Sequence, residues 1–345
     1  MKIYEERRLK LTENLSGDIA VIIPGSVLAN RSNDTAYPFR QDSNFYYLSG
    51  FNEPDSTLMI ISKSGKTNSI GFVPKKDKLK EIWDGFRYGP EGMKSDFGFN
   101  DAFNNDEIDE LLPDLLDGVS CVYYPFGKVE GFDQKVINWT KKANSKDRHS
   151  KKMEIADISK IIGNKRLIKD GSEINIIEKA CKISANAHLE AMKFVKPDMN
   201  EAEVEAFYLY EFAKNGGRFP AYNPIVASGE NACVLHYVEN NQVINDGDLL
   251  LVDAGCEYEM YASDITRTFP ANGKFSDEQL QIYNIVLEAQ KASVDAVSKG
   301  NGVMDPQTIS EKVITEGLID LGIIKGNLEE EHEKGSFKDF YMHKI

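Results

Sequence analysis

Asp253 and Asp264 are the two residues of this sequence whose type and spacing best suit chemistry. Asp253 directly follows the apolar run 249–252, which we expect to be a buried strand, and Asp264 lies within the strand-like run 256–269. A hairpin folded near residues 255–260 brings both carboxylates to one side. A carboxylate at the end of an apolar strand is costly unless something compensates it, and carboxylate oxygens suit hard divalent cations. The pair therefore predicts a metal site, and two metals there would activate water for hydrolysis.

A purely structural role is the commoner explanation of two acids in such a hairpin. Asp253 would then cap a turn, and Asp264 would pair with Arg267. His188 has apolar neighbours on an expected helix, and such a histidine is more often a core or surface residue than a ligand. Spacing alone leaves both interpretations open.

The elements that must position these acids follow from local patterns in the second half of the chain. Helical spacing of apolar residues from Ser172 predicts a helix to about Val195. Asn200 with Glu203 resembles a capping box that opens a helix ending at Lys214, and Ser276 with Gln279 opens another that ends near Lys299. A further helix is expected over 305–321, and a strand over 233–237.

The first half alternates apolar strands with helical segments, which favours a mixed sheet covered by helices. We expect a short helix over 108–116. The expected strands cover 19–23, 45–48, 57–61, 70–73 and 119–124. The length of 345 residues suits two domains, 1–165 and 166–345, with ample core.

Composition excludes several classes of function. The formal net charge of −14 argues against nucleic acid and anionic membranes as partners. None of the four cysteines forms a CxxC pair, and no disulfide framework is indicated. The sequence has no signal-type segment and no run near the roughly 18 apolar residues of a membrane span. We therefore expect a cytoplasmic protein that binds neither nucleic acid nor membrane.

Three stretches together resemble the Xaa-Pro aminopeptidases (aminopeptidase P), within the creatinase, prolidase and methionine aminopeptidase superfamily. They read VDAGCEYEMYASDITRTFP, PIVASGENACVLHYVEN and RQDSNFYYLSGF, and EIWDGFRYGPEG adds to the likeness. The resemblance covers nearly the whole chain. It implies an α/β creatinase-like N-terminal domain followed by an α+β pita-bread catalytic domain.

The resemblance also implies a site and a reaction. Asp253 and Asp264 match the first two metal ligands of a pair of divalent ions, usually Mn²⁺. His236 matches a histidine beside the substrate, and His343 matches one that contacts the substrate and its tetrahedral intermediate. The implied activity is release of the N-terminal residue from peptides with proline second, by a metal-activated hydroxide. The implied partners are such peptides and further copies of the chain.

The match is incomplete at its C-terminal end. The family uses five metal ligands, and the sequence contains only the two aspartates among them. We therefore expect a C-terminally truncated catalytic domain with an exposed sheet edge, weak metal binding and negligible activity alone. Two other functions stay open: a prolidase-type dipeptidase, and a non-catalytic binding or assembly subunit that keeps the fold.

Overall fold

The computed structural model describes residues 2–146 and 152–342, which form two compact units. The first comprises residues 1–174 and the second residues 175–345, so the division falls within a long helix. The domain boundary expected at 165/166 stays a prediction. In the described ranges, no helix is long and apolar enough to cross a membrane.

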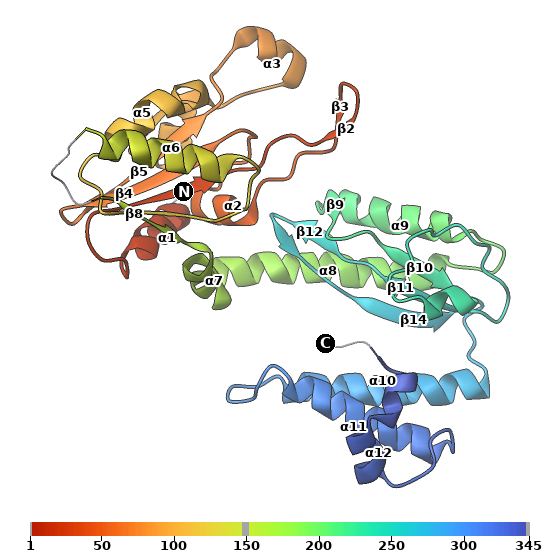
Figure 1. The fold of residues 1–345 in the computed structure, drawn as a ribbon. Helices are drawn as coiled ribbons and strands as arrows, with labels where there is room; N and C mark the ends of the chain where they lie inside the picture. Colours follow the sequence, from red (N-terminus) through yellow and green to blue (C-terminus); the bar gives the residue numbers. More distant parts are fainter. Residues whose placement is uncertain (1, 147–151, 343–345) are drawn as a thin grey trace. The chain divides into compact units, whose positions relative to one another are not determined.

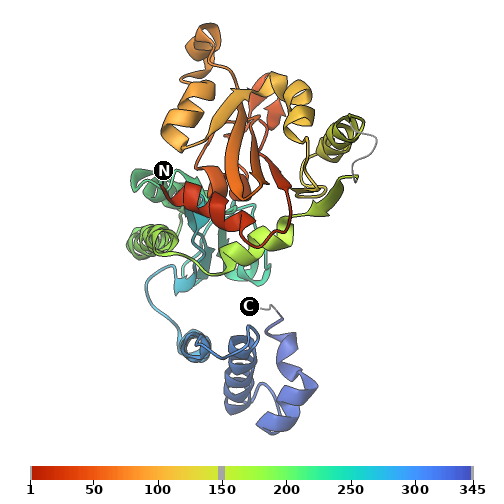
Figure 2. The ribbon, with the colours of Figure 1, turned by 90° about the vertical axis from the view of Figure 1, so that its left-hand side faces the viewer.

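The first unit contains a six-stranded mixed sheet (Figures 1 and 2). Its spatial order is β6-β5-β4-β1-β7-β8; β4 runs antiparallel to β1 and β5, and the other three pairs are parallel. The strands are β1 (Ile19–Pro24), β4 (Thr57–Lys63), β5 (Lys66–Val73), β6 (Asp101–Asn104), β7 (Cys121–Tyr124) and β8 (Glu154–Asp157). A separate small hairpin pairs β2 (Asn30–Ser32) with β3 (Thr35–Ala36).

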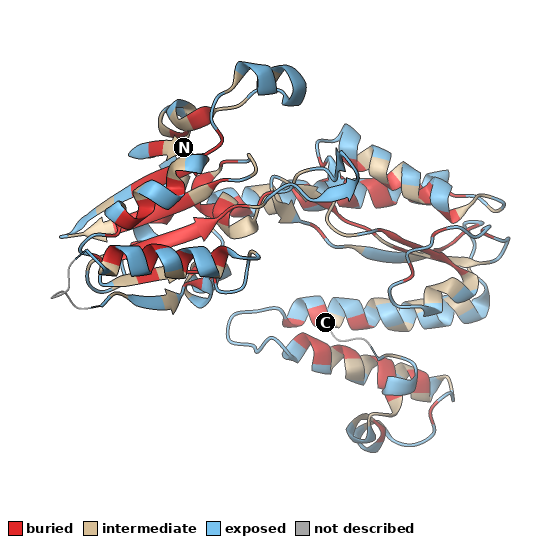
Figure 3. Ribbon diagram, turned by 45° about the horizontal axis from the view of Figure 1, so that its top comes forward, coloured by how far each residue is buried: buried red, intermediate tan, exposed pale blue. Residues whose placement is uncertain are grey.

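Helices cover both faces of this sheet, so its strands are largely buried (Figure 3), and the central strand β1 is buried along its whole length. Alternate β1 side chains enter two different cores, one with α1, α2, α4 and α7 and one with α5 and α6. The helices are α1 (Lys2–Thr12), α2 (Ser43–Ser49), α3 (Lys78–Asp84), α4 (Gly89–Phe97), α5 (Ile108–Leu115), α6 (Phe132–Asn144) and α7 (Ser159–Leu167).

The strand expected over 45–48 is wrong, because that segment is helix α2. Asp42 caps the helix by accepting hydrogen bonds from the backbone N–H groups of Asn44 and Phe45. Gly50 ends it in the left-handed conformation with φ 67°. These two terminal signals outweigh the strand preference of the aromatic residues between them.

The second unit packs two helices on one face of a small sheet. The helices are α8 (Gly171–Phe194) and α9 (Glu201–Lys214), and the antiparallel sheet has the order β10-β11-β14. Its strands are β10 (Ile225–Ser228), β11 (Leu249–Asp253) and β14 (Thr266–Pro270). A second sheet joins β9 (Phe219–Pro220), β12 (Cys256–Tyr258) and β13 (Tyr261–Ala262). Leu250 and Val252 of β11 point into the core with the helices, so Leu251 and Asp253 face the other way.

Three further helices follow β14. They are α10 (Asp277–Ala296), α11 (Asp305–Asp320) and α12 (Leu328–Lys334), and the first two share a core. The capping boxes expected at Asn200 and Ser276 both form. In the described part of the chain, β14 pairs only with β11, and α10 leaves Val286 54% exposed and Val294 64% exposed.

Candidate active site

The pairing of β11 with β14 brings the two aspartates together. Asp253 ends β11 opposite Thr266, and Asp264 lies two residues before Thr266. Gly255 permits this close approach, because a Cβ at that position would lie 1.8 Å from the Ser263 carbonyl oxygen. The hairpin expected from the sequence thus places both carboxylates at one end of the sheet.

Tyr222 joins the two carboxylates. Its hydroxyl contacts Oδ1 of Asp253, and it lies 3.0 Å from Oδ1 of Asp264. Burial and the two neighbouring carboxylates raise the pKa of the Tyr222 hydroxyl well above its usual value, so the phenol stays protonated. A phenol has only one proton, which cannot compensate two negative charges.

No cation of the described residues neutralises this pair. Neither carboxylate forms an ion pair within residues 2–146 and 152–342, and Arg267 instead donates to the carbonyl oxygen of Thr266. The alternative pairing of Asp264 with Arg267 is therefore not formed. Two converging carboxylates without a counter-charge fit a divalent cation, whose preferred ligands are such oxygens. Elsewhere in the described residues, no third His, Cys, Asp or Glu joins them in a metal-binding group.

Two buried polar residues of α8 support the backbone next to these acids. Ser184 accepts a hydrogen bond from the backbone N–H of Cys256 at 3.0 Å and lies 2.8 Å from the hydroxyl of Ser263. His188 is 3% exposed, with Nε2 3.1 Å from the carbonyl oxygen of Ala254. Burial lowers the pKa of His188, which is therefore a neutral core residue.

His236 is exposed on the segment between β10 and β11. The strand expected over 233–237 is wrong, because a 3-10 helix (Gly229–Cys233) and a turn occupy this segment. The adjacent Tyr237 packs against Ile225, Ala227 and Leu251. Leu251 and Asp253 share one face of β11, so the segment with His236 lies over the face that carries Asp253. His343 lies outside the described residues.

Tyr222 is not among the site residues predicted from the sequence. Its position in the sequence gives one indication of this role, because Tyr222 lies just before β10, the strand that pairs with the strand ending at Asp253. A phenol near two acids on neighbouring strands is a plausible contact, but only the paired register places it between them.

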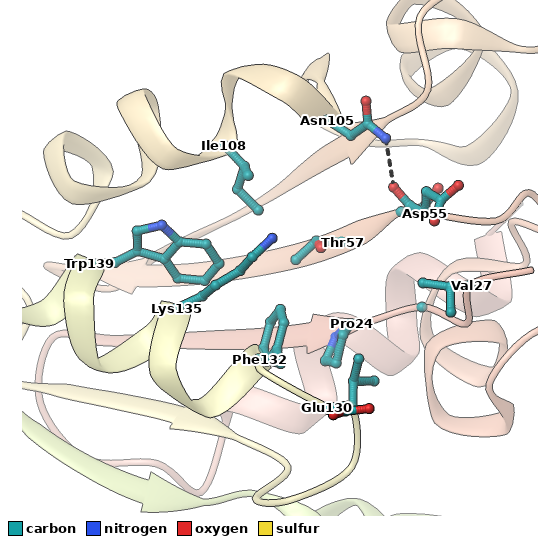
Figure 4. Close-up of a pocket in the computed structure, with 13 residues that line it drawn as sticks. Pro24, Val27, Asp55, Thr57, Asn105, Ile108, Glu130, Phe132, Lys135 and Trp139 are labelled. Carbon is teal, nitrogen blue, oxygen red and sulfur yellow. Dashed lines mark hydrogen bonds between the residues drawn. The ribbon is translucent and has the colours of Figure 1, made fainter.

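The first unit has a separate hollow of about 370 Å³ beside α6 (Figure 4). Trp139, Phe132 and Lys135 form one wall, and Asp55 and Asn105 lie across from them. Asn105 donates a hydrogen bond to the carbonyl oxygen of Asp55 at 3.0 Å, and Trp139 donates to Asp109 at 2.7 Å. Its two acidic lining residues, Asp55 and Glu130, lie apart in Figure 4, so the hollow does not compete with the Asp253–Asp264 pair as a hydrolytic site.

Comparison with known proteins matches both units. Residues 175–345 match the model "Metallopeptidase family M24", and residues 4–123 match "Aminopeptidase P, N-terminal domain". The chain is 39% identical to the Xaa-Pro aminopeptidase of Haemophilus influenzae over 99% of its own length and 77% of that protein's.

Solved structures agree with these matches. Aminopeptidase PepP of Pseudomonas aeruginosa superimposes with a TM-score of 0.95 at 39% identity, over 99% of this chain and 78% of that one. Zinc-substituted Escherichia coli aminopeptidase P in complex with product superimposes with a TM-score of 0.96 at 36% identity, over 100% and 79%. The expected fold, an aminopeptidase P N-terminal domain followed by a pita-bread catalytic domain, is therefore confirmed. The chain belongs to the Xaa-Pro aminopeptidases of metallopeptidase family M24.

Proposed function

We propose that this protein is a metal-dependent aminopeptidase that releases the N-terminal residue of peptides with proline in second position. Asp253 and Asp264 would be ligands of a pair of divalent metal ions, which we infer to be Mn²⁺. The observation that carries the proposal is the convergence of these two carboxylates on one hydroxyl without any described counter-charge. A zinc-substituted relative solved with product supports a metal site in this fold.

Different residues of the site have different roles in the proposed reaction. A divalent metal bound there supplies a Lewis acid that activates water for attack on a peptide carbonyl. Tyr222 keeps the two carboxylates oriented toward each other. The exposed imidazole of His236 donates a hydrogen bond to the substrate as charge develops on it. The backbone nitrogen of a proline residue carries no hydrogen. A peptidase that binds its substrate through that N–H therefore cannot bind a peptide bond to proline in the same way, and a dedicated site is favoured.

Two carboxylates are a weak ligand set for a divalent ion. Bound metals in hydrolytic sites usually have at least three protein ligands, and the described residues supply no third one here. We therefore expect a protein of these 345 residues to bind Mn²⁺ weakly and to show negligible peptidase activity. His343, which lies outside the described residues, is the further substrate contact that we propose.

Manganese titration of the purified protein tests this proposal. Electron paramagnetic resonance counts free Mn²⁺ directly, and we expect weak binding at one site that Asp264→Asn abolishes. Glu178→Gln, which changes an exposed acid on α8 paired with Lys182, is the matched control and leaves binding unchanged. Tight binding of two Mn²⁺ ions would refute the weak-site prediction, and binding unaffected by Asp264→Asn would refute the assignment of the ligands.

Peptide cleavage separates the proposed activity from its alternatives. Gly-Pro-Pro and Gly-Pro are incubated with the protein at high Mn²⁺, and released glycine is measured. Residual cleavage of the tripeptide, removed by Asp264→Asn, supports the aminopeptidase. Cleavage confined to the dipeptide would favour a prolidase-type dipeptidase. A folded protein that binds peptide but no metal would favour a non-catalytic subunit.

We also propose that the protein forms homo-oligomers in the cytoplasm. Helix α3 carries a cluster of large apolar side chains on the surface, with Trp83 86% exposed, Ile82 76% and Leu79 72%. Sedimentation of the wild type against Trp83→Ala tests this, and we expect the variant to shift toward the monomer. All four cysteines are free, which supports a reducing compartment.

A further inference from the structure

A buried acid in the second unit, Glu201, is unusually well supplied with hydrogen-bond donors. It is the first residue of α9, and its side chain is 0% exposed. A negative charge at a helix N-terminus is stabilised by the helix dipole. Burial of a charge is nevertheless costly unless donors surround it.

All five donors come from one segment, residues 228–242. Oε1 accepts hydrogen bonds from the backbone N–H of Ser228 at 2.8 Å, from the Ser228 hydroxyl at 2.7 Å and from the Asn231 amide at 3.1 Å. Oε2 accepts from the Tyr237 hydroxyl at 2.8 Å and from the backbone N–H of Gln242 at 3.1 Å. One carboxylate thus connects the beginning, the middle and the end of this segment, which we name the 228–242 loop.

The charge state of Glu201 matches this arrangement. Burial by itself raises the pKa of the Glu201 carboxyl, but the hydrogen bonds from Ser228, Gln242 and Tyr237 outweigh burial and bring the pKa below its usual value. Tyr237 has a raised pKa because of burial and its bond to Glu201, so it remains a donor. A glutamine at position 201 would direct an NH₂ group at donors and leave some of them unpaired.

The loop held in this way carries His236 over the face of β11 that bears Asp253. Tyr237, 7% exposed, is the buried anchor of the loop, and His236 is its exposed neighbour in sequence. Leu251, two residues before Asp253 on β11, packs against the cluster that includes Tyr237. The position of His236 relative to the strand that ends at Asp253 therefore depends on the anchoring of Tyr237.

We propose that Glu201 is a positioning residue for His236. Its carboxylate holds the 228–242 loop against β10 and β11 and thereby orients the imidazole at the peptide-binding site. Glu201 itself does not touch substrate. The proposal rests on the proposed role of His236 in binding the peptide.

Hydrogen–deuterium exchange with mass spectrometry tests the positioning. In Glu201→Gln we expect peptides from the 228–242 loop to exchange at least about tenfold faster, since hydrogen bonds to a buried charge are worth that order. Amides of β11 and α9 that exchange by local opening, rather than by global unfolding, should exchange as in the wild type. Glu211→Gln, on the same helix but paired with Lys214 outside the loop, is the matched control and should leave the loop unchanged.

A second readout reports on the imidazole itself. The ring resonances of His236 in ¹H–¹⁵N spectra, assigned with His236→Gln, should move in Glu201→Gln toward those of an unrestrained histidine. Unchanged loop exchange and unchanged His236 resonances would overturn the proposal. Faster exchange spread evenly over the whole unit would also overturn it, because Glu201 would then act only on global stability.

A milder variant covers the case in which Glu201→Gln does not fold. Tyr237→Phe keeps the ring and the charge of Glu201 but removes one donor, and a smaller change in the same loop is expected. Addition of Gly-Pro-Pro to the wild type distinguishes the two proposals. The His236 resonances could stay unchanged on addition of the peptide while Glu201→Gln still speeds exchange in the 228–242 loop. In that case the positioning role of Glu201 stands and the substrate role of His236 is refuted.

Discussion

The second unit contains two acidic centres with opposite environments. Glu201 is fully buried, and protein donors satisfy both of its oxygens. Asp253 and Asp264 lie at the open end of a sheet and share a single phenolic hydroxyl. A carboxylate that the protein has already satisfied serves the structure, whereas a pair left with excess negative charge is suited to an external cation.

The geometry of the aspartate pair depends most on Gly255. In Gly255→Ala the new Cβ would meet the Ser263 carbonyl oxygen at 1.8 Å, and a backbone atom cannot move aside cheaply. We expect the free energy of unfolding of this unit to fall by about 3 kcal/mol or more. Urea unfolding followed by circular dichroism measures the change. Gly163→Ala, where nothing lies within 4 Å, is the control, and equal midpoints for both variants would contradict the prediction.

Removal of the negative charge of Glu201 should have the next largest effect on the free energy of unfolding. Glu201→Gln leaves buried donors without an acceptor, so we expect a loss of about 2 kcal/mol in the free energy of unfolding. Glu178→Gln, in an exposed pair with Lys182 at 3.7 Å, should change it by less than about 0.5 kcal/mol. If the two variants were equally stable, the contrast between buried and exposed acids would fail.

Glu201 should also make the stability of the protein depend on pH, with a sign that follows from its pKa shift. Because the pKa of Glu201 is lower in the folded state than in the unfolded chain, its carboxylate stabilises the fold above the unfolded value of about 4.3. That contribution disappears as pH falls through the folded pKa. The stability difference between wild type and Glu201→Gln should therefore shrink on acidification from neutral pH. Tyr237, with its raised pKa, stays neutral throughout this range. A difference that grew at acid pH would contradict this.

The smallest change in stability is expected at the pair of Asp253 and Asp264. Asp264→Asn relieves repulsion between two carboxylates, so the metal-free protein should keep its stability or gain less than about 1 kcal/mol. Calorimetry without metal measures this, and a chelator serves as the control for bound ions. A large loss of stability would show that Asp264 is structural, as Glu201 is.

Local signals explain the parts of the fold that could be predicted. The helices that begin at Glu201 and Asp277 were predicted from their capping boxes, because cap and partner lie three residues apart. The segments 45–48 and 233–237 were wrongly expected to be strands. The first is decided by its helix caps, and the second by the distant carboxylate that binds Tyr237. Propensity carries no information about a partner 36 residues away.

The sequence by itself determined the candidate acids, the β-strand before Asp253 and the family, because these reside in residue types and short spacings. Only the tertiary structure decided that Tyr222 lies between Asp253 and Asp264, and that Glu201 holds the loop next to His236. Such contacts follow from strand register and helix packing, which depend on the whole chain at once.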